Sequence, residues 1–242
     1  MIKALYYIYF ICIAMPILLV ATILTALLTG VGSIMFGGKW WGYYPSHVWS
    51  RIFCALTLVR VEVQGRENFE EDKSYVFVAN HQGAYDIFSI YGYLNHNFKW
   101  MMKKSLENIP FIGFACRRAG HIFVDNSGFG AVKSTMQRAE SELKDGMSLV
   151  VFPEGSRTKT GKMSRFKRGA FQLAQEFGLP LVPITINGAY EVMTRNSILP
   201  QYGKITLTIH KPIAPPATES EIRAKTDEAF AAVYSALDER YQ

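Results

Sequence analysis

The feature that most constrains this chain is an uncharged segment near its N-terminus. Between Lys3 and Lys39 no charged residue occurs, and the 25 residues from Ala4 to Leu28 are mostly apolar. About 20 such residues suffice to cross the hydrocarbon core of a bilayer as a helix. A secretory signal has a shorter apolar region, of about 7–15 residues, with a small-residue cleavage site close behind it. We therefore predict a membrane helix here, in preference to a signal peptide or a buried soluble helix.

A second apolar stretch follows and predicts a helical hairpin. Pro16 predicts a kink, and the glycines between Gly30 and Gly38 predict a turn. The stretch from Ser46 to Val59 is apolar except for two residues. Aromatic rings favour the headgroup level of a bilayer, and four lie between the two stretches: Trp40, Trp41, Tyr43 and Tyr44.

The flanking charges leave the mode of membrane contact open. Lys3 and Lys39 flank the first helix equally, so the positive-inside rule does not separate a single crossing from a monotopic, re-entrant hairpin. We expect a membrane-associated helical hairpin over residues 1–58 and a second domain over 59–242.

From Val59 onward, short apolar runs alternate with helical patterns. This alternation predicts an α/β fold, an αβα sandwich around a central, largely buried sheet. The expected strands are Val59–Gly65, Tyr75–Asn80, Ser148–Gly155, 181–186 and 204–210. The expected helices are Ile87–Leu94, Ala131–Lys144, Phe166–Phe177 and an amphipathic C-terminal helix after the capping-box spacing Thr218–Glu221.

The balance of charges predicts anionic partners. The chain has 26 Lys and Arg against 20 Asp and Glu, a formal net charge of +6. Such a surface suits nucleic acid, an acidic lipid surface or a phosphorylated small molecule. The three cysteines, Cys12, Cys54 and Cys116, have neither zinc nor disulfide spacing, which favours a reducing compartment.

The first chemical motif is NHQGAYD, Asn80 to Asp86. A polar cluster between a strand and a helix lies where α/β folds place ligands. The spacing lets the Asp86 carboxylate reach Nδ1 of His81, which leaves Nε2 free to take a proton from a substrate hydroxyl. A capping or core histidine is the structural alternative.

The second motif follows a strand at Phe152 and reads PEGSR, followed by further basic residues and no acidic one up to Gly169. Glu154, Gly155, Ser156 and Arg157 predict a tight loop suited to phosphate and hydroxyl groups. Arg157 offers planar, bidentate donors for a phosphate. We interpret Lys159, Lys162 and Arg165 as a solvated face or as attraction to anionic headgroups.

The third motif is a lysine pair before an apolar wall. Lys103 and Lys104 precede an apolar stretch with Pro110 and Gly113. The pattern fits an anionic headgroup beside an acyl chain, and an ordinary amphipathic surface has the same pattern.

Taken in order, NHQ-x3-D, KKSL-x2-IP-x2-G, FPEG-S-R and VPI (Val182–Ile184) resemble the four blocks of the glycerolipid acyltransferase family, most of all its bacterial 1-acyl-sn-glycerol-3-phosphate acyltransferases. The resemblance covers roughly residues 75–186. It implies a mixed central sheet and acyl transfer, without metal or cofactor, from acyl-CoA or acyl-carrier protein to the sn-2 hydroxyl of lysophosphatidic acid.

The resemblance also implies roles for single residues. His81 is the expected general base and Asp86 its orienting partner. Glu154, Gly155 and Arg157 are expected to hold the glycerol phosphate, assisted by Lys103 and Lys104. The implied location is the inner (cytoplasmic) membrane with the catalytic domain on the cytoplasmic face, and the implied partners are the bilayer and the two substrates, not nucleic acid.

The chain departs from the family pattern at three positions. Asn126 stands where an arginine commonly closes the second block, which leaves another lysolipid, such as a lyso-amino-acid lipid, as an alternative acceptor. Ser156 replaces the usual threonine and keeps the hydroxyl. Gly83, where a serine is common, removes a side chain, and we expect little other effect.

Two different hypotheses stay open at this point. A covalent acyl-cysteine route is less attractive because no histidine directly adjoins Cys116 in sequence and the other two cysteines lie in apolar helices. A membrane-anchored module that binds anionic lipid or nucleic acid would also use the basic surface, and nucleic-acid binding would then depend steeply on salt.

Overall fold

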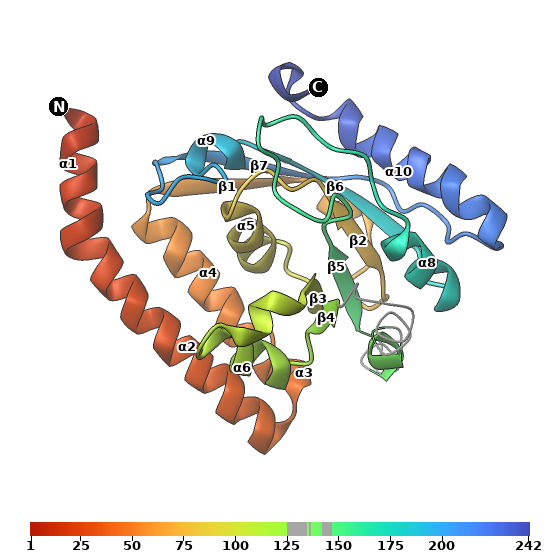
Figure 1. The fold of residues 1–242 in the computed structure, drawn as a ribbon, viewed down its shortest axis with the longest axis horizontal. Helices are drawn as coiled ribbons and strands as arrows, with labels where there is room; N and C mark the ends of the chain where they lie inside the picture. The colour runs from red at the N-terminus through yellow and green to blue at the C-terminus, as the bar shows by residue number, and fades with distance from the viewer. Residues whose placement is uncertain (125–134, 136, 142–146) are drawn as a thin grey trace.

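The computed structural model describes residues 1–124, 135, 137–141 and 147–242. The N-terminal helix α1 (Ile2–Tyr9) continues through a π-helical turn (Phe10–Ala14) into α2 (Met15–Phe36). The predicted kink at Pro16 takes this form: the wider turn lies just before the proline, which cannot donate an i→i−4 hydrogen bond. Figure 1 shows the bend between α1 and α2.

The predicted hairpin is present. Gly37, with φ +89°, ends α2, and the short α3 (Gly38–Trp41) leads into α4 (Tyr44–Leu56), which runs back beside α2 (Figure 1). A Cβ on Gly32 would lie 2.4 Å from the Trp41 ring, so the glycine permits the close turn. The division of the chain at residue 58 stays a prediction, and α4 packs closely on the second domain.

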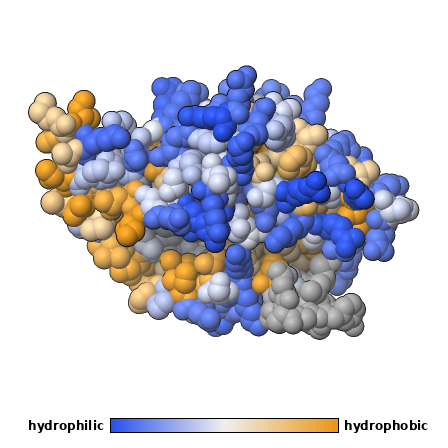
Figure 2. Space-filling model, turned by 45° about the horizontal axis from the view of Figure 1, so that its top comes forward, coloured by the Kyte–Doolittle hydropathy of each residue, from blue (hydrophilic) through white to orange (hydrophobic). Residues whose placement is uncertain are grey.

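Within the described residues, one helix is long and apolar enough to cross a membrane. It spans Ile2–Phe36, and its most apolar 18 residues have a mean hydropathy of 2.7. Its outer face is exposed, with Leu24 54% and Leu28 53% accessible. In Figure 2 apolar side chains gather along this helical edge, whereas hydrophilic ones cover most of the rest of the visible face. A contiguous apolar surface of this kind marks a membrane or protein contact.

The second domain is built on a sheet of seven strands. Their order is β1 (Val59–Gln64), β7 (Gly203–Ile209), β6 (Leu181–Asn187), β2 (Val76–Ala79), β5 (Ser148–Val151), β3 (Phe98–Lys103) and β4 (Ile122–Val124). All neighbours are parallel except β6 and β7. The predicted αβα sandwich around a mixed sheet is therefore confirmed.

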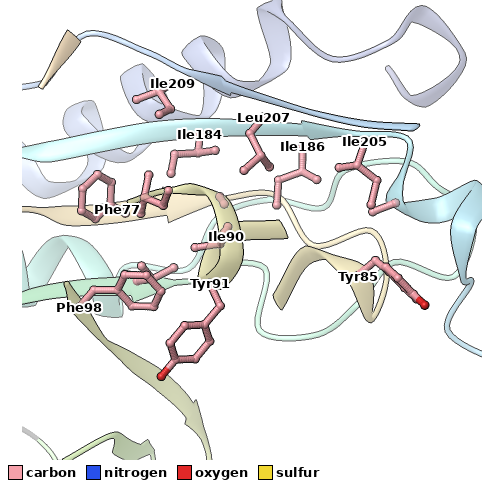
Figure 3. Close-up of a cluster of buried hydrophobic side chains, with 14 of the residues drawn as sticks. Phe77, Tyr85, Ile90, Tyr91, Phe98, Ile184, Ile186, Ile205, Leu207 and Ile209 are labelled. Atoms are coloured by element: carbon pink, nitrogen blue, oxygen red, sulfur yellow. The ribbon is translucent and has the colours of Figure 1, made fainter. Parts of the chain in front are cut away.

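Helices cover both faces of this sheet (Figure 1). On one face, α4 and α5 (Tyr85–Tyr93) bury a core that includes Phe77, Ile90, Phe98 and Ile184 (Figure 3). On the other face, α8 (Gly169–Glu176) and α10 (Ile222–Ser235) cover residues of alternate position, such as Val76 and Val78. Full burial of such side chains contributes about 1.5–3 kcal/mol each.

Some expected elements differ in extent. The strand expected over Ser148–Gly155 ends at Val151, and α8 begins at Gly169, three residues later than expected, because the segment before it is extended and Lys167 donates its N–H to the Pro153 carbonyl at 2.9 Å. The C-terminal helix begins with a 3₁₀ turn (Glu219–Glu221). The helix expected over Ala131–Lys144 lies largely outside the described residues, and 137–141 are helical.

Strands β3 and β4 were not expected from the sequence. In β3 a lysine, Lys99, is the second residue of the strand and is only 2% exposed. Its Nζ donates to the carbonyls of Gly38 at 2.9 Å and Ala119 at 2.5 Å. These acceptors satisfy a buried charge, and they tie β3 to the hairpin and to α6 (Ile112–Arg118).

We predict that charges on the outer face of α2 weaken membrane binding. Leu24→Asp with Leu28→Asp should lower the vesicle-bound fraction sharply, because each charge at the centre of a membrane helix costs roughly 3 kcal/mol. The measurement is co-sedimentation with lipid vesicles. Tyr234→Asp on α10, across the sheet from the hairpin, is the control and should bind like the wild type. Equal binding of all three proteins would contradict a membrane role for α2.

Candidate active site

The candidate site lies where strands β2 and β5 end. Because these neighbouring strands are parallel, the loops after Ala79 and Val151 leave the same edge of the sheet. The first loop carries the histidine motif, and the second carries PEGSR. The edge where such loops emerge is the usual ligand-binding edge of α/β sheets.

His81 and Asp86 are in contact, as their spacing predicts. His81 Nδ1 lies 2.7 Å from Asp86 Oδ2, and the Gly83 N–H donates to the same oxygen at 2.9 Å. The Asp86 side chain is fully buried in the first turn of α5, and that of His81 is 14% exposed. A buried carboxylate accepts the Nδ1 proton, so Nε2 is the free base; in the described part of the chain, Nε2 has no hydrogen-bond partner.

Asn80 closes the end of β2 against β6. Its side-chain amide donates to the Ile186 carbonyl at 2.9 Å, and its oxygen accepts the Ile186 N–H at 2.7 Å. This reciprocal pair replaces a rung of backbone pairing just where the strand turns into the histidine loop, which gives His81 a fixed starting point.

Glu154 joins the two loops. One carboxylate oxygen accepts the His81 N–H at 2.7 Å, and the other accepts the Ser164 N–H at 2.7 Å. The residue is 6% exposed, and burial raises the pKa of its carboxyl against the lowering effect of these two donors. Both oxygens of Glu154 are thus engaged by backbone donors, and its contact with the glycerol phosphate stays a prediction.

Gly155 and Arg157, two further residues of the second motif, follow Glu154 in the chain. Gly155 has φ +78°, a left-handed conformation that disfavours side chains, and a Cβ there would also lie 2.7 Å from Lys167 Nζ. Arg157 is half-buried, and Arg195 Nη1 donates to its carbonyl at 3.1 Å. A second guanidinium, absent from the sequence prediction, thus lies beside Arg157.

Lys103 and Lys104 are exposed at the carboxyl end of β3. Val150 of β5 lies between Trp100 of β3 and Phe77 of β2 in the sheet. Lys103 comes three residues after Trp100, and His81 comes four residues after Phe77, so both extend beyond Val150 in the same direction. All three motifs therefore emerge from one edge of the sheet. Asn126 lies outside the described residues.

Two aromatic rings missing from the sequence prediction line the histidine. The imidazole of His81 stacks on Phe152 at 4.0 Å between centroids and an interplanar angle of 6°. Phe152 in turn stacks on Trp100 at 5.4 Å and 24°. Phe152 is the first residue of the FPEG-S-R block, but the sequence indicates only that it ends a buried strand.

The other histidines and the cysteines have structural settings. His121 is buried between Tyr91 and the Trp100 N–H, and burial lowers its pKa to about 3. Burial raises the pKa of Cys54 and of Cys116 to about 12, so both are thiols at neutral pH and poor nucleophiles. The described residues contain no group of three or more His, Cys, Asp or Glu side chains suited to a metal.

Comparison with known proteins places the chain and its fold in one family. The chain belongs to the acyltransferase family, whose profile matches residues 60–187, just over half of the chain. It is 33% identical over 201 residues to a 1-acyl-sn-glycerol-3-phosphate acyltransferase of Chlamydomonas reinhardtii, which covers 81% of this chain and 58% of that protein. The corresponding protein of Saccharomyces cerevisiae is 35% identical over 146 residues, covering 59% and 46%. The chain thus spans about half the length of these curated relatives.

A solved structure extends the similarity over the whole chain. The crystal structure of the 1-acyl-sn-glycerophosphate acyltransferase PlsC from Thermotoga maritima superposes with a TM-score of 0.76 and 26% sequence identity. The match covers 96% of this chain and 95% of that one. It includes the N-terminal hairpin as well as the sheet.

Gly83 approaches a neighbouring segment more closely than the expectation of little effect assumes. A Cβ at this position would lie 2.6 Å from the carbonyl oxygens of Ala189 and Met193, at either end of α9 (Ala189–Val192). Only glycine lets the histidine loop approach this backbone without a shift.

We predict that Gly83→Ser, despite introducing the residue common in the family, impairs this protein. The backbone contact should displace the loop and lower turnover at least about tenfold, because small misplacements of catalytic groups are costly. Steady-state kinetics and thermal unfolding are the measurements. Gly169→Ser is the matched control, because nothing lies within 4 Å of a Cβ there. Wild-type turnover in the Gly83 variant would contradict the packing argument.

Proposed function

We propose that this protein transfers an acyl group from an acyl thioester to the sn-2 hydroxyl of 1-acyl-sn-glycerol-3-phosphate, giving phosphatidic acid. The observation that carries the proposal is the 2.7 Å contact between His81 Nδ1 and the buried Asp86 carboxylate, in a chain whose relatives are named for this reaction. Acyl-CoA and acyl-carrier protein both provide such a thioester.

The chemistry is a direct transfer. His81 Nε2 removes the proton of the acceptor hydroxyl as its oxygen attacks the thioester carbonyl, and Asp86 stabilises the imidazolium that forms. The attack forms the new C–O bond of a tetrahedral intermediate, and its collapse restores the carbonyl and breaks the C–S bond. The imidazolium returns its proton to the departing thiolate, so the base is regenerated and no cofactor is consumed.

An acyl-cysteine intermediate is not required. Cys54 is fully buried in α4, and the raised pKa values of Cys54 and Cys116 keep both thiols protonated. Cys12 lies in the apolar N-terminal helix. The hydroxyl of the acceptor is therefore the nucleophile in our proposal.

The basic residues around the site suit a phosphorylated acceptor. Arg157 follows the left-handed Gly155, and Arg195 lies against its carbonyl. Two guanidinium groups on adjoining loops match the charge of a phosphate monoester. Lys103 and Lys104, at the same edge of the sheet, add positive charge for the headgroup or for an anionic bilayer.

The hairpin brings this site to its lipid substrates. The apolar face of α2 associates with a membrane in our proposal, as a monotopic or single-pass anchor of the inner membrane with the second domain on the cytoplasmic face. Lysophosphatidic acid then reaches His81 from the bilayer, and the water-soluble thioester reaches it from the other side.

We predict that His81→Ala abolishes most activity without loss of folding. General-base assistance is worth about 10²–10⁴-fold, so turnover should fall by that factor while vesicle binding and thermal unfolding stay unchanged. Asp86→Asn should lower turnover by at least about 100-fold because it removes the negative charge that stabilises the imidazolium and keeps the proton of the neutral ring on Nδ1. His210→Ala, whose histidine pairs with Thr185 outside the site, is the control. Full activity in the His81 variant would disprove the proposed mechanism.

We predict that Arg157→Ala acts on the acceptor. Loss of a phosphate contact should raise the KM for lysophosphatidic acid about tenfold or more, with a smaller change in the KM for the thioester. Initial rates with each substrate varied in turn give both constants. Lys159→Ala, an exposed neighbour, is the matched control, and equal effects on both constants would count against a phosphate role.

The acceptor itself is tested by crossing substrates. Purified protein is assayed with acyl-CoA and acyl-carrier-protein donors against lysophosphatidic acid, other lysophospholipids and a lyso-amino-acid lipid, with His81→Ala as the blank. The proposal requires the highest kcat/KM for lysophosphatidic acid. A preference for an acceptor without phosphate would overturn it.

A further inference from the structure

The imidazole of His81 stacks in parallel on the ring of Phe152, a contact that the roles predicted from the motifs do not include. The two rings are 4.0 Å apart and only 6° from coplanar. The Asp86 hydrogen bond fixes one point of the imidazole, at Nδ1, but a single bond leaves the ring free to swing about that point. A flat neighbour on its face removes this freedom.

The support for Phe152 comes from the sheet. Phe152 directly follows β5, packs against the core on the α5 side and stacks on Trp100 of β3 at 5.4 Å. Trp100 is itself 4% exposed and lies beside Phe98 and Tyr91. The imidazole is therefore backed by two aromatic rings that rigid strands hold.

The stacking on Phe152 also stabilises the positive charge that His81 acquires during the reaction. During transfer His81 becomes an imidazolium, and a cation over the face of an aromatic ring is stabilised by the ring quadrupole. Asp86, in the first turn of α5, contacts the imidazole at Nδ1, and Glu154 contacts the backbone N–H of His81. Neither of these contacts is made to a face of the ring.

We propose that Phe152 is a positioning residue for the acyl-transfer reaction, which holds the plane of His81 so that Nε2 faces the acceptor hydroxyl and stabilises the imidazolium formed in the transition state. This inference rests on the proposed role of His81 as the base. The proposal adds Phe152, which lies between β5 and PEGSR, to the residues that act with His81. It also gives a reason for the placement of the two motifs on adjacent strands.

The test compares Phe152→Leu with Phe152→Tyr. Leucine keeps the apolar cover of the imidazole but removes the ring, and tyrosine keeps the ring. We expect Phe152→Leu to lower kcat about tenfold with little change in the acceptor KM. The acidic limb of its kcat profile should move to lower pH by about half a unit, because the protonated histidine loses its aromatic partner. Phe152→Tyr should restore both values.

Controls separate this role from simple packing. Phe77→Leu removes a ring from the same core away from His81, and this variant should be less stable without a change in the acidic limb of its kcat profile.

NMR titration of the His81 imidazole in detergent gives the same shift independently of activity. Phe152→Met replaces Phe152→Leu if the leucine variant does not fold. If the acidic limb of the kcat profile and the NMR titration midpoint of His81 both stay unchanged in a folded Phe152→Leu or Phe152→Met variant, while His81→Ala is inactive, this inference alone is overturned. An active His81→Ala overturns the proposed function instead.

Discussion

The site depends on the buried carboxylate of Glu154 and on the hydrogen bonds that it accepts. It accepts the backbone N–H of His81 through one oxygen and that of Ser164 through the other, each at 2.7 Å. Hydrogen bonds to a charged acceptor contribute about 1.5–3 kcal/mol each, and an unsatisfied buried charge costs more. The histidine loop and the basic loop are thereby held as one unit, although 73 residues separate His81 from Glu154.

The membrane hairpin is joined to this unit by packing. Helix α4 lies against α5, where Arg51 Nε donates to the Gly92 carbonyl at 2.7 Å and Phe53 stacks on Phe88 at 4.0 Å. Helix α5 carries Asp86 in its first turn. Helix α4 thus lies between the apolar face of α2 and the helix that carries Asp86, which fixes the candidate site relative to that face.

The sequence predicted the outline of this arrangement because the relevant signals are local. An uncharged run of 25 residues, apolar strands and a five-residue His–Asp spacing each lie within one segment. It did not reveal β3, whose buried Lys99 donates to carbonyls of distant segments, nor the close approach of Gly83 to α9. The stack of Phe152 on His81 and the contact of Arg195 with Arg157 also depend on residues brought together only by the fold.

The central claim is that Asp86 fixes His81 with its free lone pair on Nε2. The most direct measurement is ¹⁵N NMR of the imidazole in the full-length protein, in detergent micelles, above the pH at which His81 loses its charge. Our account predicts that the neutral ring carries its proton on Nδ1, with the chemical shift of a bare, basic nitrogen at Nε2. A neutral ring protonated on Nε2 would contradict it, because that nitrogen could not then accept the proton of the acceptor hydroxyl.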